Sequence, residues 1–330
     1  MKHARISLTL GAALAIAGCQ GSANLSSSAL PQTAVRPIAL HPQHQSWMAP
    51  NVAGQDLLYV SNGNGEVTVY RYWQHTLVGV LTDFTEPLGE CADGSGNVYI
   101  ADYAAEKILE YSHGGKKPIK TLDDAPDSPY ACSVDPTTGN LAVANNDGTS
   151  TQGNIAIWQK ASGSPTHYTD SKIDNFVGCA YDGNGTLFVA NVYVYGVGTF
   201  FAWLPKNGSK LVDVTVPSPD PSRGGWGYVT GIQWDGKYFA IDAYNIYRIS
   251  LIHGQAYYVG SSQLGSGDPF WIYNNTPGQQ GTQVVGGVNG NSGSRVDYWH
   301  YPAGGSPIYS LSHGVDKPFG VTISLKAQRP

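Results

Sequence analysis

The chain has 330 residues, of which 24 are acidic and 19 basic, so its formal net charge is −5. Loss of an N-terminal leader containing Lys2 and Arg5 would leave 17 basic and 24 acidic residues, a net charge of −7. A mildly acidic chain without basic runs excludes nucleic acid as the expected partner. The 41 glycines, 21 tyrosines and low charged fraction of 13% suit a single β-rich domain.

An apolar run at residues 6–17 follows the two basic residues of the leader. It is too short to span a bilayer, so it predicts a secretory signal. The sequence Ile-Ala-Gly-Cys ending at Cys19 resembles a bacterial lipobox, which implies a signal peptide at 1–18 and acyl chains on Cys19. Gln20 resembles the residue that follows the cysteine in outer-membrane lipoproteins. We therefore expect a cell-envelope protein that is lipid-anchored in the outer membrane, on its periplasmic side or at the cell surface, and that contacts the membrane only through its anchor. The alternative is an ordinary signal peptide with a chance cysteine.

Residues 19–55 are rich in Ser, Ala, Pro, Gln and His and contain few large apolar side chains. This composition predicts a flexible tether between the lipidated cysteine and a folded domain at 56–330. Residues 47–50 (WMAP) form a segment that can lie against the start of that domain.

A sequence phrase recurs along the folded domain and is clearest at residues 87–102. Each copy predicts a strand, a tight turn and a second strand, because an aspartate side chain bonds its own backbone and a following glycine supplies positive φ. The other copies lie at 128–145, 176–191, 228–242 and 269–286, and the turn aspartates are Asp93, Asp135, Asp182 and Asp235.

Third and fourth alternating runs follow each copy, such as residues 108–111 and 119–122 in the first. Four short antiparallel strands repeated every ~40 to 50 residues are typical of β-propeller blades. Residues 318–324 supply a first strand without a second, and residues 57–70 supply a second and third without a first. Joined, they form one blade that closes the ring and leaves no unpaired inner edge. With five internal copies, we predict an all-β, six-bladed propeller of four-stranded antiparallel blades, which we expect to be a monomer.

The copy at residues 87–111 resembles the NHL pattern: Pro-x-Gly, a central Asp, Gly-Asn, a Tyr-x-Ala-Asp strand end and a following Ile-x-x-Tyr strand. The domain thus resembles NHL-repeat and YVTN-type six-bladed propellers, a group that includes gluconolactonase-like enzymes. Members of such groups bind proteins or nucleic acid, hydrolyse lactones or serve as scaffolds, so the fold leaves the function open.

Three cysteines remain in the folded domain, at matching places in the repeat. Cys132 and Cys179 lie three residues before their turn aspartates and Cys91 lies two before, so Cys91 should face the opposite way. A Cys132–Cys179 disulfide would have to join strands that are not hydrogen-bonded partners, within the limit of about 7 Å between Cα atoms. We expect free, buried thiols instead.

A collar of Asx residues closes the second strand of five blades and is the main candidate site. If the blades are equivalent, these side chains gather on one face around the central channel, where carboxylate and amide oxygens suit Ca²⁺ or polar ligand groups. The alternative is that each residue caps the bend into the next loop. The collar consists of Asn62, Asp102, Asn145, Asn191 and Asp242.

Gluconolactonase-like enzymes hold a channel metal with carboxylate and amide groups, and that resemblance assigns a possible metal to Asp102, Asn145, Asn191 and Asp242. The chain departs from this pattern because it has no obvious glutamate at the start of its first blade. It also departs from virginiamycin-lyase-like propellers, which use histidine and glutamate near their channel, because it has no histidine on an inner strand. It also has no Cys-x-x-Cys, His-x-His or His-Glu-x-x-His motif. No cofactor is therefore required, and a divalent cation in the channel belongs to the alternative function.

The face that carries the collar also carries the longest predicted loops, at 146–153, 192–198, 217–227 and 287–294. The third of these brings Arg223 and Trp226 toward the same mouth, and elaborated loops on a rigid scaffold commonly bind ligands. Aromatic residues that enter the inner strands either line this mouth or pack between blades; they are Tyr130, Phe270, Trp271 and Phe319.

The sequence therefore favours a binding or scaffolding module on an envelope lipoprotein, which recognises a protein or a cell-envelope glycan through this face. The alternative is a metal-dependent, lactonase-like hydrolase or lyase that uses the central channel.

Overall fold

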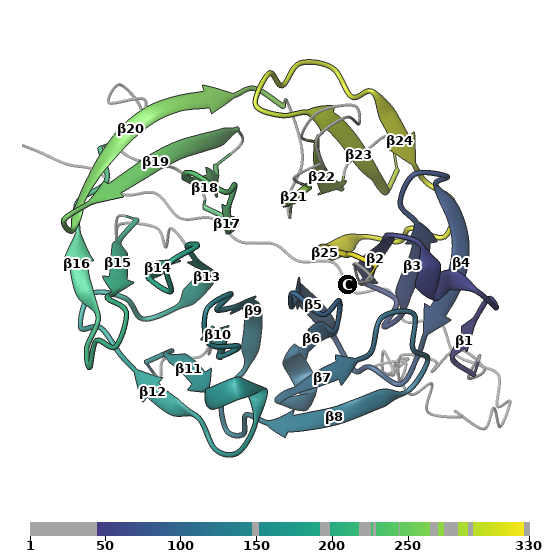
Figure 1. Cartoon of the computed structure of the whole chain (residues 1–330), viewed down its shortest axis with the longest axis horizontal. Coiled ribbons are helices and arrows are strands. Elements are labelled where there is room, and N and C mark those ends of the chain that lie inside the picture. The colour runs from purple at the N-terminus through teal and green to yellow at the C-terminus, as the bar shows by residue number, and fades with distance from the viewer. Residues whose placement is uncertain are drawn as a thin grey trace, which may run out of the picture. The chain divides into compact units, whose positions relative to one another are not determined.

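A computed structural model shows six antiparallel sheets arranged as blades around a central axis (Figure 1). All six lie in one compact unit, Gln43–Pro330. This arrangement confirms the predicted six-bladed propeller. None of the helices among the described residues is long and apolar enough to cross a membrane. The structure describes residues 45–146, 152–191, 199–217, 226, 229–243, 245–264, 270–273, 283–289 and 293–326.

Each of blades 2 to 6 contains four strands that follow the chain from the axis outward. Blade 2 consists of β5 (Pro87–Ala92), β6 (Val98–Asp102), β7 (Lys107–Tyr111) and β8 (Pro118–Asp123). Blade 3 consists of β9 (Pro129–Val134), β10 (Leu141–Asn145), β11 (Ile155–Trp158) and β12 (Thr166–Tyr168). Blade 4 consists of β13 (Phe176–Tyr181), β14 (Leu187–Asn191), β15 (Phe201–Leu204) and β16 (Val212–Val214).

The last two of these blades complete the series. Blade 5 consists of β17 (Gly231–Trp234), β18 (Phe239–Asp242), β19 (Ile246–Ile252) and β20 (Gln255–Ser262). Blade 6 consists of β21 (Phe270–Tyr273), β22 (Gln283–Val288), β23 (Arg295–His300) and β24 (Tyr309–Leu311). Three single 3-10 turns lie between strands: Val52–Gly54, Tyr103–Ala105 and Gln159–Ala161.

Blade 1 joins the two ends of the domain, as the partial repeats predict. Its innermost strand is β25 (Pro318–Ser324), which pairs along its whole length with β2 (Leu57–Asn62). β3 (Val67–Arg71) and β4 (Thr76–Leu81) follow outward. The short β1 (Trp47–Met48) adds a fifth strand on β4, so part of the stretch that we predict as a tether lies on the first blade.

The turns between first and second strands confirm the predicted Asx chemistry. The Asp93 carboxylate accepts the backbone N–H groups of Ser95 and Asn97 at 2.9 and 2.8 Å. Gly96 then adopts φ +87° and donates its N–H to the Asp93 carbonyl, a conformation that glycine adopts without strain. The same carboxylate-to-backbone bonds occur at Asp135, Asp182 and Asp235.

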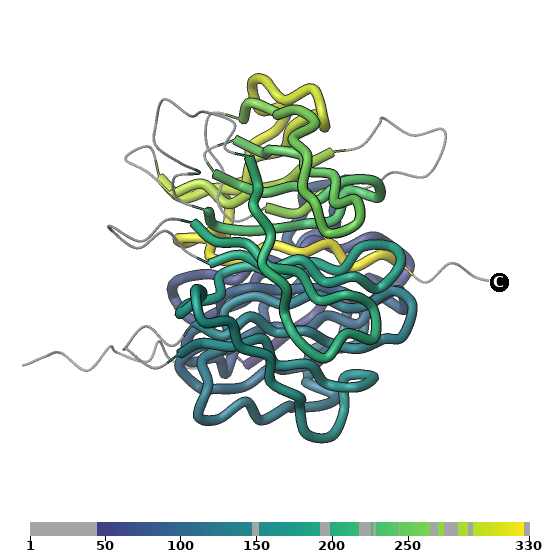
Figure 2. Tube along the Cα trace, turned by 90° about the vertical axis from the view of Figure 1, so that its left-hand side faces the viewer, coloured from purple at the N-terminus to yellow at the C-terminus, as the bar shows by residue number. Residues whose placement is uncertain are grey.

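These turns define two faces of the ring. We call the face where first and second strands join the hairpin face, and the face where second strands end the collar face. Figure 2 shows the ring from the side, with the strands running from one face to the other.

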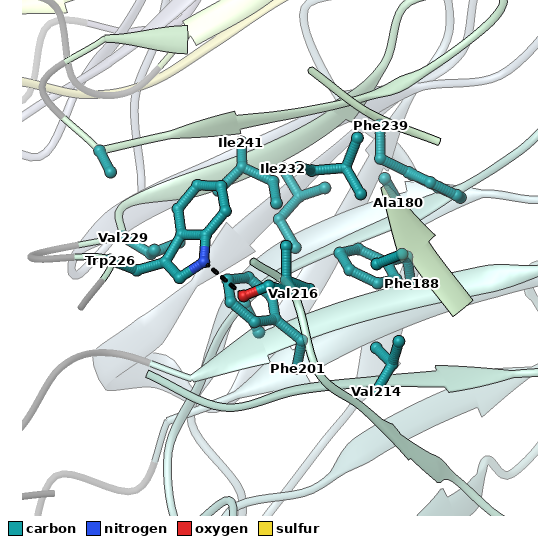
Figure 3. Close-up of a cluster of buried hydrophobic side chains, with 14 residues drawn as sticks. Ala180, Phe188, Phe201, Val214, Val216, Trp226, Val229, Ile232, Phe239 and Ile241 are labelled. Atoms are coloured by element: carbon teal, nitrogen blue, oxygen red, sulfur yellow. Dashed lines mark hydrogen bonds between the residues drawn. The ribbon is translucent and has the colours of Figure 1, made fainter. Parts of the chain in front are cut away.

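The hydrophobic core lies in wedges between neighbouring blades. Figure 3 shows the wedge between blades 4 and 5, where the rings of Phe188 and Phe239 stack with centroids 4.9 Å apart. Phe188 lies on β14 and Phe239 on β18, so this contact joins the second strands of adjacent blades. Alternating residues of each strand thus face the blades on either side, and contact between sheets holds the ring together.

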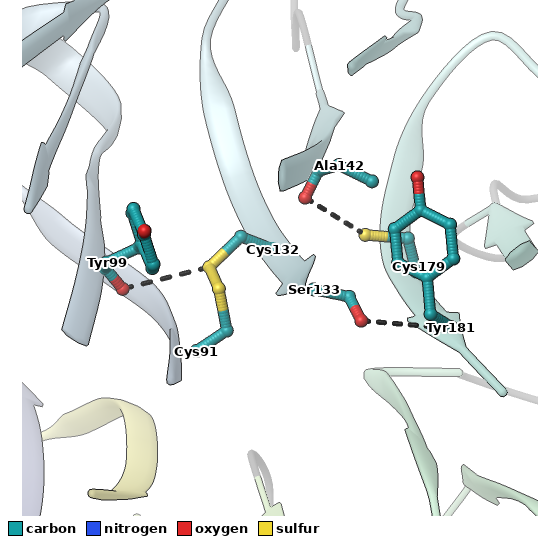
Figure 4. The surroundings of a disulfide bond; sticks show 7 residues. All are labelled: Cys91, Tyr99, Cys132, Ser133, Ala142, Cys179 and Tyr181. Atoms are coloured by element: carbon teal, nitrogen blue, oxygen red, sulfur yellow. Dashed lines mark hydrogen bonds between the residues drawn. A yellow bond between two sulfur atoms is a disulfide. The ribbon is translucent and has the colours of Figure 1, made fainter. Parts of the chain in front are cut away.

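One prediction about the cysteines is wrong: Cys91 and Cys132 form a disulfide, with Cα atoms 5.6 Å apart (Figure 4). Side-chain alternation along the strands correctly predicts that Cys91 faces the opposite way from Cys132. This opposite orientation is what brings the two thiols together between neighbouring blades. Cys91 on β5 faces blade 3, while Cys132 on β9 faces back toward blade 2, with its Sγ 3.7 Å from the Tyr99 carbonyl.

Cys132 and Cys179 face the same way around the ring and therefore do not meet. The Cys179 thiol donates to the Ala142 carbonyl of blade 3 at 3.7 Å, and Cys179 is a free, buried cysteine. The expectation of a free thiol is confirmed for Cys179 alone. Burial raises the pKa of this thiol to about 12, so the residue is an unreactive part of the core.

Candidate functional site

The five predicted collar residues are all buried, with side chains between 1% and 4% exposed. Asn62 shows what holds them: its Nδ2 donates to the Val60 carbonyl and to Thr68 Oγ1, both at 3.0 Å. Its Oδ1 accepts the backbone N–H of Asp316 at 2.9 Å. Asn62 therefore fixes the chain that enters the inner strand of its own blade.

The other collar residues hold similar connections. Asp102 Oδ1 accepts the N–H groups of Thr85 and Glu86 at 3.0 and 2.7 Å, just before β5. Asp242 Oδ2 accepts the hydroxyl of Thr230 at 2.9 Å, just before β17. At the start of third strands, Asn191 Oδ1 accepts the N–H of Phe200 at 2.6 Å, and Asn145 Nδ2 donates to Asn154 Oδ1 at 3.0 Å. Each residue thus makes the local bonds that are typical of Asx caps.

Arg223 and Trp226 are the two loop residues that the sequence analysis places at the collar face, and the structure describes only Trp226. Arg223 lies outside the described residues. Trp226 is 8% exposed, and its indole N–H donates to the Val216 carbonyl at 3.0 Å (Figure 3). Its ring also makes an edge contact with Phe201, at 5.3 Å between centroids. The structure thus places Trp226 in the core wedge between blades 4 and 5.

The central channel is narrow where the inner strands meet. The cavity there has a volume of about 50 Å³ and is lined by residues of all six blades, including Glu90, Tyr130 and Phe319. Pockets for drug-sized ligands measure about 300 to 1,000 Å³, so this part of the channel has room only for water. Phe319 is 42% exposed, whereas Phe270 is buried in the core between blades 5 and 6. The predicted aromatic residues therefore divide between the exposed end of the channel and the core.

Glu90 is a buried carboxyl group beside this channel that the sequence analysis does not identify as a site residue. Ser61 donates to its Oε1 at 2.6 Å, and Oε2 has no hydrogen-bond partner. Burial raises the pKa of Glu90 to about 8, and the Ser61 hydroxyl partly offsets that effect. The side chain is therefore largely protonated at neutral pH.

Larger depressions open on the hairpin face. One of about 190 Å³ is lined by Tyr181, Trp234 and Trp271, and the two disulfide-bonded cysteines also line it. A second of about 250 Å³ is lined by Trp271, Tyr273 and Leu325. Trp271 borders both, and it packs against the core between blades 1 and 6 and the core between blades 2 and 3. We call these two depressions and their shared wall the hairpin-face mouth.

One group of three potential metal ligands occurs among the described His, Cys, Asp and Glu residues. Asp124, Asp127 and His167 each offer one ligand atom, and these atoms lie within 4.8 Å of one another. Asp102 and Asp242 do not belong to it. The sequence analysis misses this group because blade packing brings together residues that are about 40 positions apart. The spacing of the two aspartates ahead of an inner strand is the only local signal.

Comparison with known proteins supports the architecture. No family model and no curated protein matches the chain. A chain in the crystal structure of a nidogen/laminin complex aligns with a TM-score of 0.58 and 13% identity, covering 83% of this chain and 99% of that one. A protein of unknown function from Bacteroides caccae aligns with a TM-score of 0.59 and 11% identity, covering 82% and 99%. At these identities the likeness shows the fold, a six-bladed β-propeller.

Proposed function

We propose that this protein is a ligand-binding lipoprotein of the bacterial cell envelope, whose propeller recognises a protein partner at the hairpin-face mouth. The observation that carries the proposal is the pair of adjoining, aromatic-lined depressions that share Trp271. Each is too small for a drug-sized molecule but large enough for one or two side chains of an extended segment. Tryptophan and tyrosine are the residues most enriched at the centres of protein interfaces.

Three further arguments support this proposal. One structural neighbour is a chain from a nidogen/laminin complex, so a propeller of similar architecture occurs in an assembly of two proteins. The repeat phrase at 87–111 resembles NHL and YVTN-type propellers, several of which bind proteins. Cys19 and its lipobox-like context would hold the module at the membrane, since several acyl chains give firm anchoring. Substitution Cys19→Ala should then release the protein from the membrane fraction.

Site-specific photocrosslinking in intact cells tests the binding site. Benzoylphenylalanine at Leu325, which is 48% exposed beside the mouth, should give a discrete crosslinked product. The same probe at Ile119, which is 57% exposed on the outer strand of blade 2, is the matched control. Trp271→Ala combined with the Leu325 probe should reduce the product. Equal products at Leu325 and Ile119, or a product that Trp271→Ala leaves unchanged, would refute this site.

A glycan is the second candidate ligand, because two tryptophans at one mouth suit stacking against sugar rings. The same crosslink distinguishes the two: foreign peptides found by mass spectrometry of the product identify a protein, and a loss of mass on digestion by a peptidoglycan hydrolase identifies a wall glycan. The lactonase-like alternative would need the collar side chains to bind a channel metal, whereas the buried side chains of Asn62, Asp102 and Asp242 make hydrogen bonds to neighbouring groups of the connections they hold.

A further inference from the structure

We infer that the protein binds a divalent transition-metal ion, of which Zn²⁺ is the representative, on the collar face between blades 2 and 3. The ligands are the carboxylates of Asp124 and Asp127 and the imidazole of His167, with the side-chain oxygen of Asn145 beside them. This site lies outside the channel and outside the hairpin-face mouth, and it does not depend on the proposed function.

The connection between the two blades brings the aspartates together. Asp124 directly follows β8, and its backbone N–H donates to the Glu106 carbonyl at 3.0 Å. The N–H of Asp127 then donates to the Asp124 carbonyl at 2.8 Å. This tight turn presents both carboxylates to blade 3, where β12 supplies His167. His167 Nε2 lies 3.3 Å from Asp127 Oδ2.

Buried oxygen atoms without a regular hydrogen bond are the second observation that indicates a cation site here. Asp124 is 2% exposed; its carboxylate contacts the Asn145 side chain, but neither carboxylate oxygen makes a hydrogen bond of regular length and angle. Asn145 is 1% exposed and interacts with the Asp124 side chain, but its Nδ2 makes its regular bond to Asn154 and its Oδ1 has no partner. A buried polar group left unpaired destabilises the folded state. A cation would satisfy these oxygens together.

The donor set identifies the class of ion. One imidazole nitrogen with two or three oxygens matches Zn²⁺ and related ions, whereas Ca²⁺ takes six to eight oxygen ligands. Two carboxylates balance the 2+ charge. The His167 side chain is 45% exposed and that of Asp127 is 21% exposed, so the ion has a path from solvent to the buried Asp124.

The bound ion would link the connection after blade 2 to the outer strand of blade 3. The Cys91–Cys132 disulfide joins the inner strands of the same two blades. A metal at this point would therefore hold the two blades together a second time, farther from the ring axis than the disulfide does. The competing explanation for the unpartnered oxygens is a proton on the buried Asp124 side chain.

Zn²⁺ binding to the purified full chain, without a polyhistidine tag and after chelator treatment, tests the site by competition with a chromophoric chelator. We expect one equivalent, with affinity weakened about tenfold or more in His167→Ala and in Asp124→Asn. His300→Ala, which removes an exposed histidine on β23, is the matched control and should bind as the unmodified chain does. Asp124→Asn keeps the shape of the side chain and removes only one carboxylate oxygen, so this variant should remain folded.

Cobalt substitution tests His167 as a ligand directly. In a His167→Cys variant, Co²⁺ should gain a thiolate-to-cobalt band in the near ultraviolet, and His300→Cys should show none. The inference fails if Zn²⁺ binds His167→Ala and the unmodified chain equally, or if only Ca²⁺ raises the melting temperature. It also fails if Asp124→Asn stabilises the protein while Zn²⁺ shifts no melting temperature, since a proton then accounts for the site.

Discussion

Glu90 places a carboxyl group beside the axis of the ring, where charge is costly. The Ser61 hydroxyl bonds one oxygen, the other has no partner, and burial raises the pKa to about 8. An unfolded glutamate titrates near pH 4.3, so the folded state holds this proton more tightly than the unfolded state does.

This difference predicts how stability depends on pH. The contribution of Glu90 to the free energy of unfolding is largest below about pH 4.3 and falls as pH rises to about 8, where the folded protein also loses the proton. Glu90→Gln keeps a neutral side chain at every pH, so the variant should lose less stability across this range. Denaturant midpoints measured from acid to alkaline pH would show the difference. The exposed Glu86→Gln is the control, and identical pH profiles for Glu90→Gln and the unmodified chain would contradict the argument.

At the scale of the element, glycine sets how closely the inner strands approach. A Cβ atom on Gly320 of β25 would clash with the Leu88 carbonyl of blade 2, and one on Gly89 would clash with the Tyr130 carbonyl of blade 3. A Cβ on Gly178 would lie 3.2 Å from the backbone nitrogen of Ile232 in blade 5. The Pro-x-Gly pattern in the repeat thus has a steric cause: backbone meets backbone around the channel.

Gly320→Ala should therefore destabilise the protein by about 1–3 kcal/mol, the usual cost of overpacking, or more because the obstacle is backbone. Gly94→Ala is the matched control, since no atom lies within 4 Å of its added Cβ, and its effect should stay within about 0.5 kcal/mol. Thermal unfolding of both variants checks this. A Gly320→Ala variant as stable as Gly94→Ala would show that the inner strands separate easily.

The Cys91–Cys132 disulfide also holds two inner strands together, those of blades 2 and 3. It joins residues 41 positions apart, for which the chain-entropy estimate of stabilisation is about 4 kcal/mol. Reductant should lower the denaturant midpoint of the unmodified chain and of Cys179→Ala, but not that of a Cys91→Ser/Cys132→Ser double variant. If reductant leaves the unmodified chain unchanged, the bond does not contribute to stability.

These elements show what the sequence can and cannot predict. Strands, turns and blade number follow from the spacing of Asp93, Asp135 and Asp182, because turn chemistry is local. The disulfide is missed because the pleat gives the direction of Cys91 and Cys132 but not which blade each one faces. The buried bonds of Asn62 and Asp102 and the cluster around Asp124 depend on packing between distant segments, which no local pattern reveals.

At the scale of the molecule, binding surfaces on a propeller divide between its two faces. Among the residues that the structure describes, the collar face has buried polar side chains that fix the connections, and the hairpin face has two aromatic-lined depressions. The narrow cavity at the inner strands separates them. Ligands at the hairpin-face mouth and a metal near Asp124 would therefore act at separate sites on one rigid body.

Blade 1 has a consequence for how the gene could be rearranged. Ser324 pairs directly with Leu57, and the N–H of Lys326 donates to Asp56 Oδ1 at 3.0 Å, so the ends of the propeller already touch. A short peptide could join them, and new ends could then be opened at an exposed turn such as the one at Gly163. Such circular permutants would keep every blade while moving the ends of the chain around the rim, so that the proposed lipid anchor could be joined to the ring at a position chosen by experiment.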